Sequence, residues 1–409
     1  MLKSNRAAII IAGFAVAASL AGCGEGPEAD KSAQADGNQA TGKSIPVGMI
    51  SQEDSPSGSF PENRENVEAA LEYINKELGG IDGRPLELHS CITDGSPEKS
   101  GTCAREILDE NPLMFIGGVD FGTATSLPVL ARAGVSQLGG VPILPADYTS
   151  ENVFQFVPGS AGAYPALAGY MVNVAGVKSA AIIHADDAAG RAVATTYGSD
   201  IFNELGVTDV NMVAVDPNAA DFTTAVTKAN DGDPDGIMIA QAAAGCTRVM
   251  QTAQGLGMTT PMFYSSACAT HAVAKAGGSA AEGAYFVNSL ESVDGDSDDA
   301  ATYRRVMEEY RPDTPIGGIG AYSFMSAMNA YSVASTLESD DLNPEGITKA
   351  MKNTVDHDSF MGHDFTCDGQ QLEGSPSVCT AWQKMWQYEG GKFVDLSDEW
   401  VDGSVAGKQ

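Results

Sequence analysis

The sequence contains few basic residues: 23 lysines and arginines stand against 54 aspartates and glutamates, giving a formal net charge of −31. Nucleic acids and anionic lipid head groups are bound by basic surfaces, so this composition excludes partners recognised by their phosphate charge. The excess of acid predicts a solvated surface suited to high salt. The 409 residues, of which 43% are hydrophobic, suffice for two or three domains with buried cores.

Motifs for catalysis and for metal binding are also absent. There is no G-x-S-x-G nucleophile elbow and no H-E-x-x-H zinc motif, and the five histidines are scattered. The cysteines show no C-x-x-C spacing. Residues 37–44 match the letters of a phosphate-binding loop, but they lead into Ile45 and Pro46 instead of a helix, so we interpret the match as coincidence. We therefore expect no enzyme, no metal and no cofactor.

Long apolar runs are missing except near the start of the sequence. Lys3 and Arg6 precede an apolar or small run over residues 7–20, which is too short to span a bilayer and is typical of a secretory signal. The string that follows, Leu-Ala-Gly and then Cys23, resembles the lipobox of bacterial lipoproteins. We expect residues 1–22 to be a lipoprotein signal peptide and Cys23 to carry the lipid. The alternative is an ordinary signal peptide followed by a chance cysteine.

Residues 23–44 are predicted to form a lipidated flexible tether. After the cysteine this segment has no aromatic and no branched aliphatic residue, so it cannot bury enough surface to offset its chain entropy. The protein is therefore expected outside the cytoplasm, attached to the cell surface or to the periplasmic side of a membrane through the lipid anchor only.

The remaining cysteines agree with export. Seven cysteines minus Cys23 leave six, an even number that fits an oxidising compartment. Six cysteines allow 15 pairings, but three local pairs each bracket a loop-rich stretch, and we predict these as disulfides that contribute about 3 kcal/mol each. The pairs are Cys91 with Cys103, Cys246 with Cys268, and Cys367 with Cys379.

Short apolar runs alternate with helical patterns from residue 45 onward. The stripe Val67, Ala70, Leu71, Ile74 and Leu78 predicts one helical face within residues 62–78. Strands are expected at residues 45–50, 85–89, 113–117 and 141–144 in a first series, at 180–184, 210–215, 236–240 and 262–264 in a second, and at 382–388 with 392–396 in a closing hairpin. Helices between strands indicate right-handed βαβ units and parallel sheets.

This order predicts an α/β protein with two doubly wound, Rossmann-like lobes. We expect an N-terminal lobe of residues 45–155 with 285–340, a C-terminal lobe of residues 156–284 with 341–400, and a tail of residues 401–409. Ligands of open α/β sheets lie beyond the carboxyl ends of the strands, so the predicted site lies between the two lobes.

Several segments resemble the leucine/isoleucine/valine-binding family of periplasmic binding proteins. The resemblance rests on the order and spacing of these segments. The segments are residues 47–50, 57–60, 69–75, 79–83, 115–118, 141–146, 154–158 and 281–286. The resemblance implies a type I periplasmic-binding-protein fold with a multi-crossover hinge. It also implies a monomeric receptor that closes around a small molecule and delivers it to ABC permease subunits.

The resemblance further implies which positions meet the ligand. They follow strand ends and are Ser59, Phe60, Asp120, Thr123, Ala146 and Tyr148 in the first lobe, and Ala189 and Ala267 in the second. Hydroxyls such as those of Thr123 and Tyr148 would hold a ligand carboxylate, while Phe60 and Tyr148 would either stack on the solute or pack at the hinge. Asp120 stands where the family tends to have serine, and no acid stands near Ala267 where the family meets an ammonium. Either Asp120 is the cation partner, or the ligand has no ammonium.

The function expected from this resemblance is capture of a small organic solute for an ABC importer. The solute would be an amino acid, an amino-acid-like compound or an aromatic acid. The alternative is a ligand-sensing extracellular lobe that reports to a membrane signalling partner.

Overall fold

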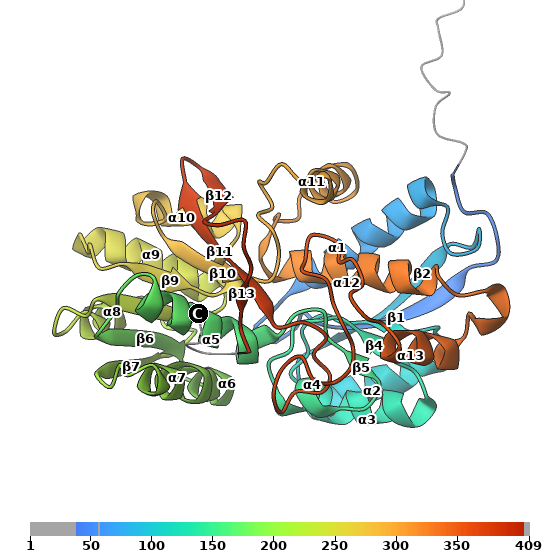
Figure 1. Cartoon of the computed structure of the whole chain (residues 1–409), viewed down its shortest axis with the longest axis horizontal. Coiled ribbons are helices and arrows are strands. Elements are labelled where there is room, and N and C mark those ends of the chain that lie inside the picture. Colours follow the sequence, from blue (N-terminus) through green and yellow to red (C-terminus); the bar gives the residue numbers. More distant parts are fainter. Residues whose placement is uncertain (1–37, 56–57, 405–409) are drawn as a thin grey trace, which may run out of the picture. The chain divides into compact units, whose positions relative to one another are not determined.

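The computed structural model describes residues 38–55 and 58–404, without the side chain of Ala189. Cys23, the predicted signal peptide and residues 23–37 of the predicted tether lie outside the described residues. Strands and helices alternate along the described chain, and the strands form two sheets (Figure 1). Across residues 38–55 and 58–404, no helix combines the length and the apolar character needed to cross a bilayer.

The first sheet is parallel and has the strand order β2-β1-β3-β4-β5. Its strands are β1 (Ile45–Gln52), β2 (Leu86–Thr93), β3 (Phe115–Ile116), β4 (Gln137–Leu138) and β5 (Val153–Phe154), connected by α1 (Pro61–Tyr73), α2 (Pro97–Leu108), α3 (Thr123–Ala133) and the short α4 (Pro145–Thr149). The apolar stripe predicted for α1 is buried from Val67 to Ile74, and the helix continues as one π-helical turn to Leu78. It ends where Gly79 takes a φ of 88°, a left-handed value that favours glycine.

The fourth strand lies earlier than the predicted residues 141–144. β4 pairs with β3 and β5 through Gln137 and Leu138 only. The chain then leaves the sheet because Gly139 takes a φ of 68°, and a side chain there would meet the Ser326 hydroxyl at 2.0 Å. Residues 141–144 therefore form a loop at the carboxyl end of β4.

The second sheet has the order β12-β11-β10-β9-β8-β6-β7, with β13 paired to β11. Its strands are β6 (Ala180–Ala185), β7 (Val210–Val215), β8 (Gly236–Ala240), β9 (Met262–Tyr264), β10 (Tyr285–Asn288), β11 (Trp382–Glu389), β12 (Lys392–Asp395) and β13 (Val401–Asp402). The connecting helices are α5 (Gly159–Asn173), α6 (Ala188–Ala192), α7 (Asp200–Glu204), α8 (Thr223–Ala229), α9 (Ala243–Leu256) and α10 (His271–Gly277). β6 to β10 run parallel, and β11 with β12 forms the predicted antiparallel hairpin.

The expected boundaries differ from the structure at three places, one of which is the predicted tail, where residues 401 and 402 form β13 and pair with β11. β10 pairs with β9 and β11 in the second sheet, so the chain returns to the first lobe only after Asn288 and not at residue 285. The helices α11 (Asp298–Tyr310) and α12 (Gly318–Ala334) then pack on α1, and α13 (Pro344–Lys352) packs on α12. Residues 344–352 were expected in the C-terminal lobe. They belong to the first lobe, because the buried face of α13 packs on α12.

Three chain segments cross between the lobes and hydrogen-bond to one another. The backbone of Gln155 in the first crossover pairs with Ser377 and Cys379 in the third. Ser289 in the second crossover bonds to Gln383, which lies at the start of β11. The multi-crossover connection predicted from the sequence is therefore present, with its segments side by side.

Three disulfides join the six described cysteines in the predicted pairs. Cys91 in β2 bonds to Cys103 in α2, and Cys367 bonds to Cys379 ahead of β11. Cys246 in the first turn of α9 bonds to Cys268 in the 3-10 turn after β9. This last bond ties together two loops at the carboxyl ends of neighbouring strands.

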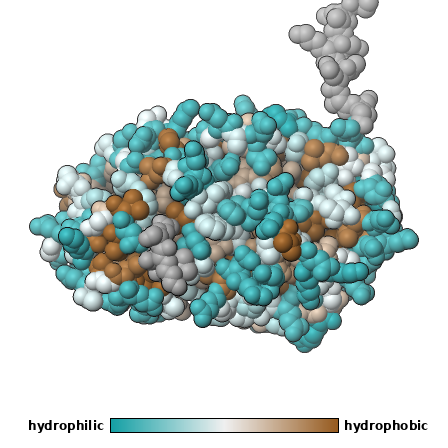
Figure 2. Space-filling model, viewed as in Figure 1, coloured by the Kyte–Doolittle hydropathy of each residue, from teal (hydrophilic) through white to brown (hydrophobic). Residues whose placement is uncertain are grey.

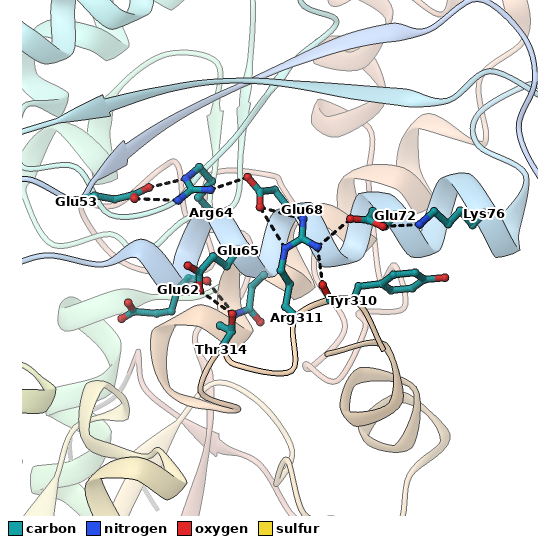
Figure 3. Close-up of polar contacts among 11 residues, drawn as sticks. Glu53, Glu62, Arg64, Glu65, Glu68, Glu72, Lys76, Tyr310, Arg311 and Thr314 are labelled. Carbon is teal, nitrogen blue, oxygen red and sulfur yellow. Dashed lines mark hydrogen bonds and ion pairs between the residues drawn. The ribbon is translucent and has the colours of Figure 1, made fainter. Parts of the chain in front are cut away.

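The face of the molecule in Figure 2 is covered mainly by hydrophilic side chains, with apolar residues between them. This agrees with the solvated surface expected from the composition. Many of the ion pairs gather on α1 (Figure 3). Arg64 pairs with Glu53 at 2.7 Å and Glu68 at 2.7 Å, while Arg311, after α11, pairs with Glu68 at 3.0 Å and Glu72 at 2.9 Å. Arg311 therefore fastens the end of α11 to α1.

Replacing Arg311 with methionine should lower the free energy of unfolding by about 1 kcal/mol, because Glu68 and Glu72 lose a partner that is only a quarter exposed. The measurement is urea unfolding followed by circular dichroism. Arg305 is the matched control, since its ion pairs with Glu77 and Glu309 are more exposed, and Arg305→Met should change the stability less. Equal effects of the two variants would contradict the prediction.

Asp147 is the most deeply buried carboxylate of the first-lobe loops. It is 4% exposed, and its Oδ2 accepts hydrogen bonds from the backbone N–H of Ile143 at 2.9 Å and of Leu144 at 2.8 Å. Burial raises the pKa of Asp147 to about 6 despite these bonds. The folded state therefore binds a proton more tightly than the unfolded state, and this contribution to stability is present at low pH and is lost as the pH rises through about 6.

The Asp147→Asn variant keeps the acceptor oxygen but has no titratable group. Between pH 5 and pH 7.5, wild-type protein should lose about 1 to 2 kcal/mol of stability relative to Asp147→Asn. Urea unfolding at both pH values measures this difference. The exposed Glu151→Gln serves as the control and should show no such relative change. If wild-type protein gains stability relative to Asp147→Asn over this range, the assigned direction is incorrect.

Candidate functional site

A cavity of about 160 Å³ lies at the carboxyl ends of the strands of both sheets. Its wall comes from loops after β1, β3 and β4 and from the start of α12 in the first lobe. Loops after β6, β8, β9 and β10 and the start of α5 supply the opposite side. This is the place where open α/β sheets bind ligands, and it agrees with the site expected between the lobes.

The first-lobe wall is apolar. Its hydrocarbon residues are Phe60, Val119, Phe121, Val141, Ile143 and Ile319, and Tyr322 adds one hydroxyl. Glycines allow the loops that carry them to run close together, since a side chain at Gly117 would lie 2.0 Å from the carbonyl oxygen of Gly139. The rings of Phe60 and Phe121 pack edge to face with centroids 6.2 Å apart.

Tyr322 of α12 extends from the first lobe to the second crossover. Its hydroxyl accepts a hydrogen bond from the backbone N–H of Ser289 at 3.0 Å, and both residues line the cavity. Tyr164 of α5 lines the cavity beside Ser265, and burial raises the pKa of Tyr164 to about 12. Both hydroxyl groups therefore remain protonated at neutral pH.

The second-lobe wall carries most of the polar groups. Ser265 and Ser266 follow β9, and Gln241 follows β8. Gln241 is 6% exposed, and its Nε2 has no hydrogen-bond partner among the described residues. A buried amide donor without a partner is unfavourable, so this group is available for a ligand or water.

Asp187, between β6 and α6, also lines the cavity. Its Oδ1 accepts the backbone N–H of Gly190, another wall residue, at 2.7 Å. The neighbouring Asp186 instead pairs with Arg191 at 2.6 Å.

Two of the predicted ligand residues, Phe60 and Ala267, line this cavity from opposite lobes. Ser59 lies in an adjoining hollow that shares both residues, and its hydroxyl donates to the carbonyl oxygen of Glu53 at 2.6 Å. Ala189 lies in α6 beside Gly190, which lines the cavity.

The other four predicted residues lie behind the cavity wall. Thr123 is 6% exposed at the start of α3, and Ala146 packs beneath the first-lobe loops. Tyr148 is 3% exposed, and its hydroxyl donates to the carbonyl oxygen of Pro142 at 2.8 Å. These contacts hold the loops that present Val141 and Ile143 to the cavity.

Asp120 is also held within the first lobe. It accepts hydrogen bonds from the hydroxyls of Ser100 at 2.6 Å, Thr93 at 3.3 Å and Ser126 at 3.4 Å, and from the backbone N–H of Gly122 at 3.0 Å. Burial raises the pKa of Asp120, while these bonds oppose the rise. Its neighbours Val119 and Phe121 line the cavity instead.

Val119, Asp187, Gln241 and Ser265 line the cavity but were not among the residues predicted to meet the ligand. A signal was present, because these residues lie within four positions of the end of a predicted strand, at the edge where ligands bind. Successive side chains of an extended segment point in opposite directions, so Val119 and Phe121 share a face that Asp120 does not. Nothing local indicates which of the two faces meets the cavity.

Within residues 38–55 and 58–404, one group of cysteine and carboxylate side chains lies close enough together to be considered as metal ligands, but it does not form a metal site. It consists of Cys91, Cys103 and Glu106, and both sulfur atoms belong to a disulfide.

Comparison with known proteins identifies the family. The model of the family described as "Periplasmic binding protein" matches residues 44–386. The search of curated proteins finds no match.

Solved structures share the fold at low sequence identity. A possible leucine/isoleucine/valine-binding protein from Rhodopirellula baltica is 14% identical with a TM-score of 0.74, over 88% of this chain and 98% of that one. A branched-chain amino acid transporter substrate-binding protein from Streptococcus pneumoniae, in complex with isoleucine, is 15% identical with a TM-score of 0.69, over 88% and 99%. A fatty acid ABC transporter substrate-binding protein from Thermomonospora curvata is 14% identical with a TM-score of 0.73, over 92% and 97%.

The family match covers most of the sequence, and the two sheets with their crossovers agree with it. The chain belongs to the family of periplasmic binding proteins and has the type I fold that the leucine/isoleucine/valine-binding proteins share.

Proposed function

We propose that this protein is the extracytoplasmic solute-binding subunit of an ABC importer. The observation that carries the proposal is the cavity whose wall is shared by the two lobes at the carboxyl ends of their strands. The family consists of solute-binding proteins and not of enzymes, and it implies an extracytoplasmic location. The proposed partners are a small organic solute and the permease subunits of the importer.

The cavity favours a compact solute with a large apolar part. An engineered apolar cavity of roughly 150 Å³ accommodates benzene, and the volume here is similar, about 160 Å³. The apolar first-lobe wall would cover the carbon-rich part of the solute, and the serines and Gln241 would meet its polar part. An amino-acid-like or aromatic compound has this size and has separate apolar and polar parts.

Closure of the lobes about the three crossovers is the proposed mechanical step. Phe60 and Ala267 lie on opposite lobes, so a solute that contacts both would stabilise the closed arrangement. Hydrogen bonds between the crossovers, such as those of Gln155 to Ser377 and Cys379, would keep the lobes in register during the motion.

Membrane attachment through Cys23 remains part of the proposal and rests on the sequence alone. The lipid would hold the chain at the membrane through the tether of residues 23–44, and the bound form would act as a monomer. The acidic surface agrees with a membrane contact made by the lipid and not by protein side chains.

Mass spectrometry of the solute that purified protein releases on denaturation identifies the ligand, and calorimetric titration should then give one site per chain. Ala267→Trp should weaken binding at least about 100-fold, because the indole ring occupies the cavity needed by the solute. Ala276→Trp is the matched control, since Ala276 is exposed on the same lobe and does not line the cavity. Unchanged affinity of Ala267→Trp would exclude the cavity as the binding site.

A further inference from the structure

Asp187 supplies the one carboxylate among the described residues of the cavity wall. Among the described residues that line the cavity there is no lysine, arginine or histidine. A ligand carboxylate would therefore enter the cavity beside the carboxylate of Asp187 and without a cationic partner, which is unfavourable. A ligand cation would meet a carboxylate.

The loop after β6 leaves Asp187 free for such a cation. The basic residue nearest in sequence, Arg191, pairs with Asp186 at 2.6 Å, and no ion pair involves Asp187 within residues 38–55 and 58–404. The bond from Gly190 N–H to Oδ1 orients the carboxylate and leaves its other oxygen as an acceptor.

Four aromatic rings complete the surroundings of the cavity. Phe60 and Phe121 come from the first lobe, Tyr164 from α5 and Tyr322 from α12. The faces of aromatic rings attract cations, and this attraction adds to that of a carboxylate. One acid surrounded by aromatic and aliphatic groups matches an ammonium attached to a hydrocarbon body.

Asp120, the other acid considered as a cation partner, is excluded from this role by its contacts. Three hydroxyls and one backbone N–H satisfy it inside the first lobe, away from the cavity wall.

We propose that the cavity selects a small organic amine with a compact branched or aromatic hydrocarbon body, and that the ammonium group binds the carboxylate of Asp187. This inference rests on the proposed solute-binding function and names its ligand class. Gln241 and the serines of the second lobe then bind any polar substituent near the ammonium.

The test compares four probes of similar size by calorimetric titration at pH 7.5 and constant salt. Two are amines, 3-methylbutylamine and 2-phenylethylamine; one is the neutral 3-methylbutan-1-ol, and one is the anion 4-methylpentanoate. Wild-type protein should bind at least one amine about tenfold or more tightly than the alcohol and the anion.

Asp187→Asn should weaken amine binding by about 30-fold or more, because the amide keeps the acceptor for Gly190 but lacks the charge. Asp186→Asn removes the same charge one residue away, outside the cavity wall, and should change the affinity less than about threefold. Thermal unfolding of both variants checks that the fold is retained.

The proposal is overturned if no amine binds, if the alcohol or the anion binds as tightly as the amines, or if Asp187→Asn retains the amine affinity. The proposed function is judged separately by the solute that purified protein releases. Purified protein could release an anionic or neutral solute whose binding is abolished by Ala267→Trp. That result would support solute binding in the cavity and would reject the amine class. Failure to capture any solute would reject the proposed function itself.

Discussion

The buried hydrogen bonds that join α1 to α11 and α12 are the constraint on which the cavity depends. The Ser323 hydroxyl donates to Oδ1 of Asn63 at 2.8 Å, and the Tyr303 hydroxyl of α11 donates to Oδ1 of Asn66 at 3.1 Å. All four side chains are fully buried, so an unpaired group there would be costly. These bonds fix one arrangement of helices that are distant in sequence. Because Phe60 precedes α1 and Ile319 lies in the first turn of α12, that arrangement also positions part of the cavity wall.

The cavity combines an apolar side and a polar side, and each side comes mainly from one lobe. Phe60, Val119 and Phe121 offer the solute only hydrocarbon, while Asp187 and Gln241 of the second lobe offer a charge and an amide. A solute with one polar end would therefore bind with that end toward the second lobe and its apolar end toward the first. The apolar side supplies favourable burial, and the polar side supplies discrimination, since groups left unpaired in a closed cavity are penalised.

Much of the fold was predictable because local sequence patterns indicate its strands and helices. The strands Val210–Val215, Gly236–Ala240 and Met262–Tyr264 have the predicted bounds, and the disulfides join cysteines close in sequence. The site was less predictable. Phe60 and Ala267 line the cavity, but Asp120 and Tyr148 turn into the first lobe because Ser100 and Pro142 offer them hydrogen bonds. Such partners become neighbours only after the loops have packed.

The sequence by itself determined the alternation of strands and helices, and with it two parallel-strand lobes whose carboxyl ends carry the ligand loops. It also determined the acidic surface, through the 54 acidic residues. Only the tertiary structure decided that Asp187 is the one acid of residues 38–55 and 58–404 that enters the cavity wall. The physical reason is that the direction of a side chain in an irregular loop has no sequence period. It is decided by contacts such as the pairing of Asp186 with Arg191 and the bond of Asp187 to Gly190.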